Sequence, residues 1–155
     1  MRLKDKVAIV TGAAWGMGAS TAELFAAEGA CVMVTDILDA EGTDVVARIS
    51  DSGGQARFCT LDVTSDTDWA SVVGETISTF GQIDILVNNA GVGLVKQITE
   101  VTEAEWDDCL DTNLKGAFLT CKHVIPWMAK HGGSIINISS NAGILPRAHD
   151  PVYSI

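Results

Sequence analysis

Short runs rich in β-branched residues alternate along the whole chain with longer segments whose apolar residues recur about every 3.6 positions. The short runs are typical of strands, and we predict strands at residues 7–11, 31–36, 56–62, 83–88 and 134–139. Strands joined by helical crossovers run parallel and connect in a right-handed sense, so few topologies remain. The pattern predicts an α/β fold built on a doubly wound parallel sheet with strand order 3-2-1-4-5.

Three of the intervening segments carry helix signals of their own. A helix beginning after Ser65 has one apolar face, formed by Trp69, Val72, Val73, Thr76, Ile77 and Phe80. Thr102 and Glu105 have the spacing of a capping box, and the helix they begin is predicted to run to Gly132–Gly133 with a kink at Pro126. The first helix is predicted to have a core face formed by Met17, Thr21, Leu24 and Phe25.

Length, charge and composition limit the possible functions. The 155 residues predict a single domain over residues 1–155, without a linker or repeat. A net charge of −10 would repel a phosphate backbone, which argues against nucleic acid as a partner. The apolar runs are too short to span a bilayer, the N-terminus lacks the apolar stretch of a signal peptide, and the four cysteines lack metal-ligand spacing. We therefore expect a cytoplasmic protein with reduced core cysteines, no membrane partner and no metal site.

A glycine-rich turn follows the first predicted strand and leads into the first helix. Residues 11–18 read TGAAWGMG, with glycines at positions 12, 16 and 18. Glycine here allows positive φ, close approach of the backbone to a pyrophosphate, and tight packing of helix on strand, while the positive end of the helix faces the anion. A plain tight turn also uses glycine, so the motif alone leaves both interpretations open.

The second predicted strand ends at Asp36, 18 residues after Gly18. An acidic side chain at this place can accept hydrogen bonds from the ribose hydroxyls of an adenosine, and it would repel a 2′-phosphate. Asp36 could instead cap the next helix, as aspartate often does at a strand end. Because the glycine turn precedes Asp36 at the spacing typical of dinucleotide-binding sites, ribose binding is the favoured interpretation.

Polar residues also follow the other predicted strands. Asp62 ends the third strand, the segment Asn88–Gly91 (NNAG) follows the fourth, and Asn137, Ser139 and Ser140 lie at the fifth. In an open parallel sheet, the carboxyl ends of the strands meet at one crevice where the strand order reverses. Ordinary turn formers explain one such strand end, whereas the repetition at every strand indicates a binding site.

With these motifs in place, the sequence resembles the short-chain dehydrogenase/reductase family over essentially all 155 residues. The resemblance rests on the turn at residues 11–18, Asp62–Val63, the segment Asn88–Gly91, Asn113, and Ser140 placed 13 residues before Tyr153. It implies a Rossmann-type fold with NAD as cofactor. The cofactor contacts that it implies are Gly12, Gly16, Met17, Gly18, Asp36, Ile37, Asp62, Val63, Asn89, Ala90, Gly91 and Tyr153.

The resemblance also implies the chemistry, a hydride transfer between NAD(H) and a secondary alcohol or ketone. Tyr153, the only tyrosine, matches the acid/base, and Ser140 matches the residue that holds the substrate oxygen. Asn113 matches a residue whose helix distortion holds a proton-relay water, although an asparagine is also tolerated inside a helix. The family has a lysine four places after the tyrosine, and that place lies past residue 155.

Three further expectations follow from the resemblance. The domain is expected to be incomplete at its C-terminus and inactive alone, since the lysine and the family's remaining strands are absent from the 155 residues. A complete chain is expected to form a homo-oligomer, a dimer or tetramer, while the alternative is a truncated, non-catalytic dinucleotide-binding module. Trp15 departs from the family, which more often has a small or basic residue there; it could pack over the adenosine or cover the turn.

Overall fold

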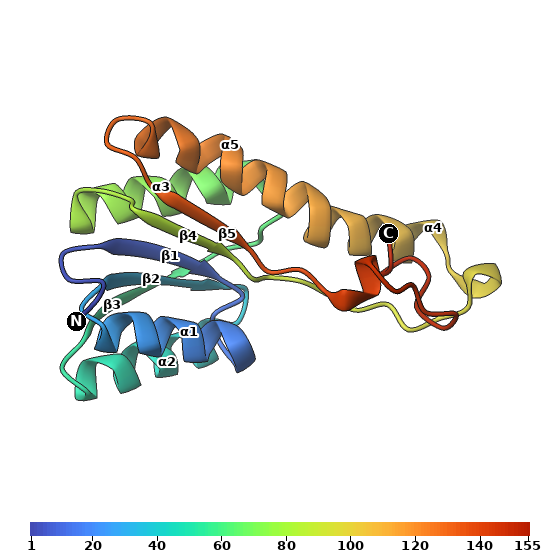
Figure 1. The fold of residues 1–155 in the computed structure, drawn as a ribbon, viewed down its shortest axis with the longest axis horizontal. Coiled ribbons are helices and arrows are strands. Elements are labelled where there is room, and N and C mark those ends of the chain that lie inside the picture. The colour runs from blue at the N-terminus through green and yellow to red at the C-terminus, as the bar shows by residue number, and fades with distance from the viewer.

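The computed structural model describes all of residues 1–155 as five strands and five α-helices joined by short turns (Figure 1). The strands are β1 Val7–Thr11, β2 Cys31–Asp36, β3 Gln55–Thr60, β4 Ile85–Asn88 and β5 Ser134–Asn137. The helices are α1 Gly16–Ala27, α2 Asp39–Asp51, α3 Asp66–Phe80, α4 Glu103–Leu110 and α5 Gly116–Met128. The bounds of β1 and β2 are as predicted, whereas β3, β4 and β5 differ from the prediction by one or two residues at an end, because pairing with the neighbouring strand decides where a strand ends.

All five strands run parallel in the order β3-β2-β1-β4-β5, which confirms the predicted α/β fold class and strand order. Thr11 at the end of β1 pairs with Thr35, and Asn88 at the end of β4 pairs with Asn137. The carboxyl ends of the strands therefore lie along one edge of the sheet. The order reverses between β1 and β4, where a crevice is expected in a fold of this kind.

Helices cover both faces of the sheet and create two separate cores. Figure 1 shows α1 and α2 against one face, and α3 and α5 against the other. Alternate residues of β1 divide between them: Ala8 and Val10 pack in the core under α1 and α2, and Ile9 packs in the core under α3 and α5. All five residues of β1 are buried, and the first four are apolar, as expected for a central strand covered on both faces.

The predicted core face of α1 is only partly correct: Phe25 packs against the core under α1 and α2, but two of the other residues do not. Met17 and Leu24 are exposed to 69% and 54%, and the buried residues of the helix are instead Gly18, Ala19, Ala22 and Ala26. The reason is the closeness of helix and strand: a Cβ atom at Gly18 would overlap the carbonyl oxygen of Gly12. Only the smallest side chains fit where the helix lies closest to the strand, so Met17 and Leu24 point outward.

The start signals of α3 and α4 are confirmed. The Ser65 side chain accepts a hydrogen bond from the Asp68 amide at the start of α3, whose residues Trp69, Val72, Val73 and Thr76 are buried. Thr102 and Glu105 form a reciprocal capping box at the start of α4. Both signals lie within four residues of chain, which is why the sequence is sufficient to identify them.

The long predicted helix is divided. A π-helical segment, Asp111–Lys115, separates α4 from α5, and α5 ends at Met128, four residues before Gly132 with its positive φ of 86°. Pro126 lies in the last turn of α5, so the irregularity within the helix is at Asn113 rather than at the proline. This position agrees with the helix distortion that the family resemblance implies at Asn113.

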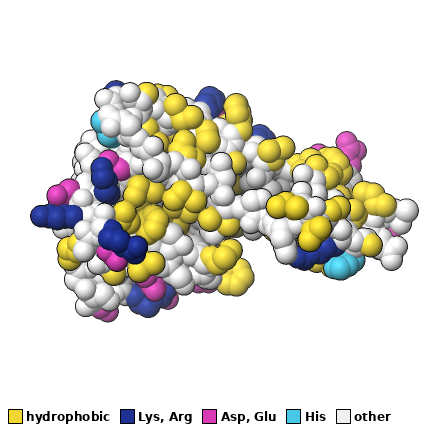
Figure 2. Space-filling model, viewed as in Figure 1, with side chains coloured by type: hydrophobic (Ala, Val, Ile, Leu, Met, Phe, Trp, Pro, Cys, Tyr) yellow, Lys and Arg dark blue, Asp and Glu magenta, His cyan; other side chains and the backbone are white.

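One side of the α4–α5 region and the outer edge of β5 remain uncovered. Leu114, Phe118 and Ile125 are exposed on the helices, and Trp106 is exposed to a lesser degree. Figure 2 shows apolar side chains across this face of the molecule, and Figure 1 shows the segment after β5 extending past the carboxyl ends of the strands. None of the helices is both long and apolar enough to cross a membrane.

Candidate functional site

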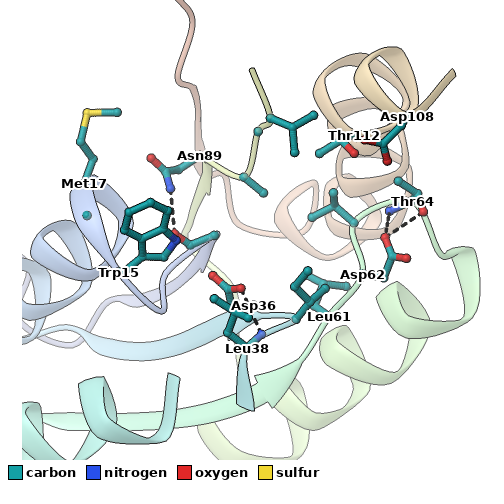
Figure 3. A pocket seen from close by; sticks show the side chains of 17 residues that line it. Trp15, Met17, Asp36, Leu38, Leu61, Asp62, Thr64, Asn89, Asp108 and Thr112 are labelled. Atoms are coloured by element: carbon teal, nitrogen blue, oxygen red, sulfur yellow. Dashed lines mark hydrogen bonds between the residues drawn. The ribbon is translucent and has the colours of Figure 1, made fainter. Parts of the chain in front are cut away.

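A cavity of about 580 Å³ lies at the carboxyl ends of the strands, at the place where the strand order reverses. Its 17 lining residues come from the glycine turn, the ends of β2, β3 and β4, and one side of α4 (Figure 3). Segments that are far apart in the sequence therefore meet at one open site. The lining includes ten of the predicted cofactor contacts, namely Gly12, Gly16, Met17, Asp36, Ile37, Asp62, Val63, Asn89, Ala90 and Gly91.

The glycine turn lies against the segment that follows β4. Gly12 and Gly16 have positive φ values of 60° and 58°, which glycine adopts without strain. A Cβ atom at Gly12 would stand 2.8 Å from the Cα of Ala90. Gly18 does not line the cavity; it lies beneath the turn, where its missing side chain lets α1 approach the backbone of Gly12. The turn thus needs glycine both for conformation and for space.

Thr11 joins the ends of β1 and β4 by a set of buried and partly buried hydrogen bonds. Its hydroxyl oxygen accepts from the amides of Asn89 and Ala90, both at 3.0 Å, and donates to the carbonyl of Val87. The Asn89 side chain returns two hydrogen bonds, from Nδ2 to the carbonyl oxygens of Thr11 and Gly12. These contacts hold the floor of the cavity rigidly between the glycine turn and the NNAG segment.

Asp36 is fixed at one end of the cavity by two backbone amides. Its Oδ2 accepts from Ala14 in the glycine turn at 3.0 Å, and its Oδ1 accepts from Leu38 at 3.2 Å. Asp36 is not the N-cap of α2, since that position is taken by Leu38, which makes no side-chain cap. Each carboxylate oxygen keeps a lone pair for a further donor, so the group is positioned to accept hydrogen bonds from a ligand.

The wall of the cavity opposite Asp36 is also acidic. Asp62 accepts from the amide and hydroxyl of Thr64, both at 2.8 Å, while Asp108 and Thr112 reach the cavity from α4 and the start of the π-helical segment (Figure 3). The 17 lining residues include three aspartates and neither lysine nor arginine. The three carboxylates therefore offer acceptors for hydroxyl and amino donors, and they would repel an anionic group placed directly beside them.

Asn113 anchors the segment after β4 to the π-helical segment. Its Oδ1 accepts from the Val92 amide at 2.8 Å, and its Nδ2 donates to the Val92 carbonyl at 2.9 Å. Nδ2 also contacts the sulfur of Cys109, whose thiol pKa is raised by burial. Asn113 lines a second, small cavity of about 40 Å³ next to the main one. Its side chain is thus fully engaged, and it shapes the wall beside Gly91.

The predicted catalytic pair belongs to the segment that follows β5. The Ser140 hydroxyl accepts from the Ala142 amide at the start of a short 3₁₀ turn, and Tyr153 is half-buried in the turn formed by residues 151–154. Neither residue lines the main cavity or its small neighbour. The structure brings the predicted cofactor contacts together in one cavity, except Gly18 and Tyr153. The predicted catalytic residues Ser140 and Tyr153 lie on the segment after β5 and do not line that cavity.

Several lining residues were missed by the sequence interpretation. Leu38, Leu61, Thr64, Val92, Asp108 and Thr112 contribute to the cavity without having been predicted, and Trp15 was left undecided. Thr64 follows Asp62–Val63 directly, so the strand-end argument could have included it. Asp108 and Thr112 carry no sequence signal, because only the packing of α4 and the π-helical segment turns them toward the strand ends.

Comparison with known proteins agrees with this architecture. The family model described as short chain dehydrogenase matches residues 6–155. An uncharacterized oxidoreductase of Thermotoga maritima is 40% identical over 156 residues, which cover 100% of this chain and 61% of the relative. The chain thus spans about three fifths of the length of that curated relative.

Two solved structures with the same fold are 35% and 37% identical to this chain in sequence. A 7α-hydroxysteroid dehydrogenase complexed with NADH and 7-oxo glycochenodeoxycholic acid superposes with a TM-score of 0.95 at 37% identity, covering 99% of this chain and 60% of that one. A metagenomic short-chain oxidoreductase in complex with NADP superposes with a TM-score of 0.94 at 35% identity, covering 99% and 71%. With its parallel sheet, its glycine turn beside the NNAG segment and its match over residues 6–155, the chain belongs to the short-chain dehydrogenase/reductase family.

Proposed function

We propose that the chain binds NAD(H) and belongs to an oxidoreductase that transfers a hydride between this cofactor and a secondary alcohol or ketone. The observation that carries the proposal is the Asp36 carboxylate, which is fixed by two backbone amides at the end of a 580 Å³ cavity above the glycine turn. Glycine at positions 12 and 16 leaves space for a pyrophosphate against the backbone. The residues present therefore fit an adenine dinucleotide.

The preference for NAD(H) over its 2′-phosphorylated form rests on charge. Two unit charges 4 Å apart interact by about 4 kcal/mol at an effective dielectric constant of 20. If solvent screening halves the repulsion between Asp36 and a 2′-phosphate, about 2 kcal/mol remains, which is roughly a thirtyfold difference in affinity. No cationic side chain among the lining residues offsets it.

The adenosine would be held at Asp36 and Ile37, with Asp62 and Val63 on the opposite wall, and the pyrophosphate at Gly12, Gly16, Met17 and Gly18. Asn89, Ala90 and Gly91 form the floor beneath the rest of the dinucleotide. When bound, the nicotinamide supplies the hydride acceptor or donor. The open trough between the glycine turn and α4 agrees with a long, two-part ligand of this kind.

The proton chemistry is assigned to the segment after β5. Tyr153 would act as acid/base for the hydroxyl proton of the substrate and would contact the cofactor ribose, while Ser140 would hold the substrate oxygen. The helix distortion at Asn113 would hold a proton-relay water beside Gly91, a role supported by the π-helical geometry at residues 111–115. An alcohol or ketone substrate agrees with the oxo-steroid ligand held by the related 7α-hydroxysteroid dehydrogenase.

We further propose that the whole protein forms a homo-oligomer. The exposed apolar side of the α4–α5 region is the surface that supports this proposal, since Leu114, Phe118 and Ile125 are all exposed there. Size-exclusion chromatography with light scattering measures the oligomeric state directly. A monomer at micromolar concentration would refute the assignment.

Titration with NADH and NADPH tests the cofactor assignment. We expect about thirtyfold tighter binding of NADH than of NADPH. Asp36→Ala should narrow that ratio because it removes both the ribose acceptor and the repulsion. Asp44→Ala is the matched control, since it removes one acidic charge from an exposed position of α2 outside the cavity. Equal or tighter binding of NADPH to the unmodified protein would refute the proposal.

A further inference from the structure

The segment after β5 contains two short turns, one at each of the two predicted catalytic residues. Ser140 begins the first, a 3₁₀ turn over Asn141–Gly143, and Tyr153 lies in the second, formed by residues 151–154. The backbone hydrogen bonds made among residues 140–155 lie either within residues 140–145 or within residues 147–155, and none joins the two groups. Backbone hydrogen bonding therefore does not fix Ser140 relative to Tyr153.

Arg147 connects the two turns. Its Nη2 donates to Oδ1 of Asn141 in the first turn at 2.9 Å, and its Nη1 lies 3.6 Å from Oδ2 of Asp150, which directly precedes the second turn. Its backbone amide donates to Oγ of Ser154 in the second turn at 3.3 Å. Figure 1 shows the chain folding back on itself in this segment. One guanidinium group, whose donors lie in a rigid plane, thus contacts both sides of the fold-back.

Asp150 depends on this arginine to balance its charge. Its side chain is 4% exposed, its Oδ1 is buried without a hydrogen-bond partner, and Arg147 is the only cationic side chain within 4 Å. A buried carboxylate without a nearby cation is strongly disfavoured, so loss of the guanidinium would drive Asp150 toward solvent. The Asp150 carbonyl accepts from the amide and the hydroxyl of Ser154, so this shift would also move the turn that contains Tyr153.

We infer that Arg147 is a positioning residue: its side chain fixes the turn of Ser140 against the turn of Tyr153, and so sets the gap in which both hydroxyls would meet one substrate oxygen. The inference rests on the catalytic roles proposed for those two residues. Arg147 itself would touch neither the substrate oxygen nor the cofactor. Because reacting groups must be held closely in their productive geometry, a small error in this gap lowers turnover more than it weakens binding.

Arg147→Met removes the guanidinium and keeps an unbranched stem. In the whole protein, it should lower kcat about ten- to a hundredfold, while KM for the alcohol changes less than about threefold. NADH affinity should stay nearly unchanged, because the adenosine half would be held at Asp36 and the glycine turn. Arg147→Lys keeps the charge without the planar fork, so it should recover part of the loss. Arg57→Met is the matched control, since it removes a half-exposed arginine that pairs with Glu75 at 2.7 Å, away from both turns.

Two further measurements separate positioning from a general loss of stability. Asn141→Ala breaks the same contact from the other side, so the double variant should be no slower than Arg147→Met alone. The ring signal of Tyr153 in NMR, assigned with Tyr153→Phe, should move or broaden in Arg147→Met and stay in place in Arg57→Met. A change that only destabilised the fold would leave this signal of the folded protein where it was.

Unchanged kcat in Arg147→Met, additive losses for the Arg147 and Asn141 variants, or an unchanged Tyr153 signal overturns the inference and leaves the proposed function intact. An equal loss of kcat in Arg57→Met overturns it as well. Should Arg147→Met fail to fold, Asn141→Ala, which leaves the ion pair with Asp150 in place, must by itself lower kcat, and an unchanged value overturns the inference. Retained turnover in Tyr153→Phe overturns the proposed catalytic role of Tyr153 and this inference together.

Discussion

Thr11→Val tests the buried connection between the ends of β1 and β4. Valine has nearly the shape of threonine, but it lacks the hydroxyl that accepts from the amides of Asn89 and Ala90 at 3.0 Å. Thr11 is 1% exposed, so water does not reach the side-chain position directly. The substitution therefore leaves two amides without an acceptor, together with the Val87 carbonyl that the hydroxyl served.

The expected loss of stability follows from those groups. A buried amide without a partner costs about 1–3 kcal/mol. Asn89 and Ala90 are partly buried, so the low end of this range applies to each, and the net loss should be about 2–3 kcal/mol. For a chain of this size, that loss lowers the melting temperature by roughly 5–10 °C. The variant should also bind NADH more weakly, since both amides belong to residues that line the cavity.

Urea unfolding followed by circular dichroism measures the stability, and amide hydrogen exchange at Asn89 and Ala90 reports the two contacts directly. Thr11→Ser is the matched control: it keeps the hydroxyl and loses only a buried methyl group, for about 1 kcal/mol. The reasoning would be refuted by equal losses in the two variants, or by unchanged exchange protection of both amides in Thr11→Val.

Two further predictions concern catalysis and pH. Tyr153→Phe and Ser140→Ala should lower turnover by orders of magnitude while leaving NADH binding nearly unchanged, because the dinucleotide would be held mainly by the glycine turn and the ends of the first two strands. Turnover would be assayed in a chimera in which residues 1–155 replace the matching segment of the Thermotoga maritima relative, and retained activity of the phenylalanine variant would contradict the role of Tyr153. Hydrogen bonds from Lys96, and then from Thr102, lower the pKa of Glu105 from 4.5 to about 2. The stability that the ionised Glu105 contributes is thus complete above about pH 4.5 and is lost as the pH falls toward 2. Between pH 6 and pH 2.5, the urea concentration at the unfolding midpoint should therefore fall less in Glu105→Gln than in the unmodified protein. Parallel curves for the two proteins would contradict this role of Glu105.

The cofactor assignment and the catalytic assignment depend on different residues, so either one can be wrong while the other is right. The first depends on Asp36 and the cavity around it, which is lined by the glycine turn, the ends of β2, β3 and β4, and one side of α4. The second depends on Ser140 and Tyr153, on a segment that follows β5 and reaches past the sheet. A protein that binds NADH without turnover would fit the alternative of a non-catalytic dinucleotide-binding module.

Much of this protein could be predicted from the sequence, because the relevant signals are local. The burial of β1 follows from its run of apolar residues, and the caps at Ser65 and Thr102 involve partners three residues away. The strand order follows from the handedness of crossovers, and the convergence of Asp36 and the NNAG segment follows from parallel strands. Each of these needs only periodicity, chirality and short-range hydrogen bonding.

Other features were decided by contacts between segments far apart in the chain. The face of α1 that is turned to the sheet carries small side chains because Gly18 must approach Gly12 closely. The apolar pattern of the helix does not contain this constraint. The π-helical segment at residues 111–115, where the Asn113 side chain binds the backbone of Val92, has no local signature. The exposure of Trp15 beside Asp36 likewise depends on what packs around it, since a side chain is buried or left in solvent only by its tertiary neighbours.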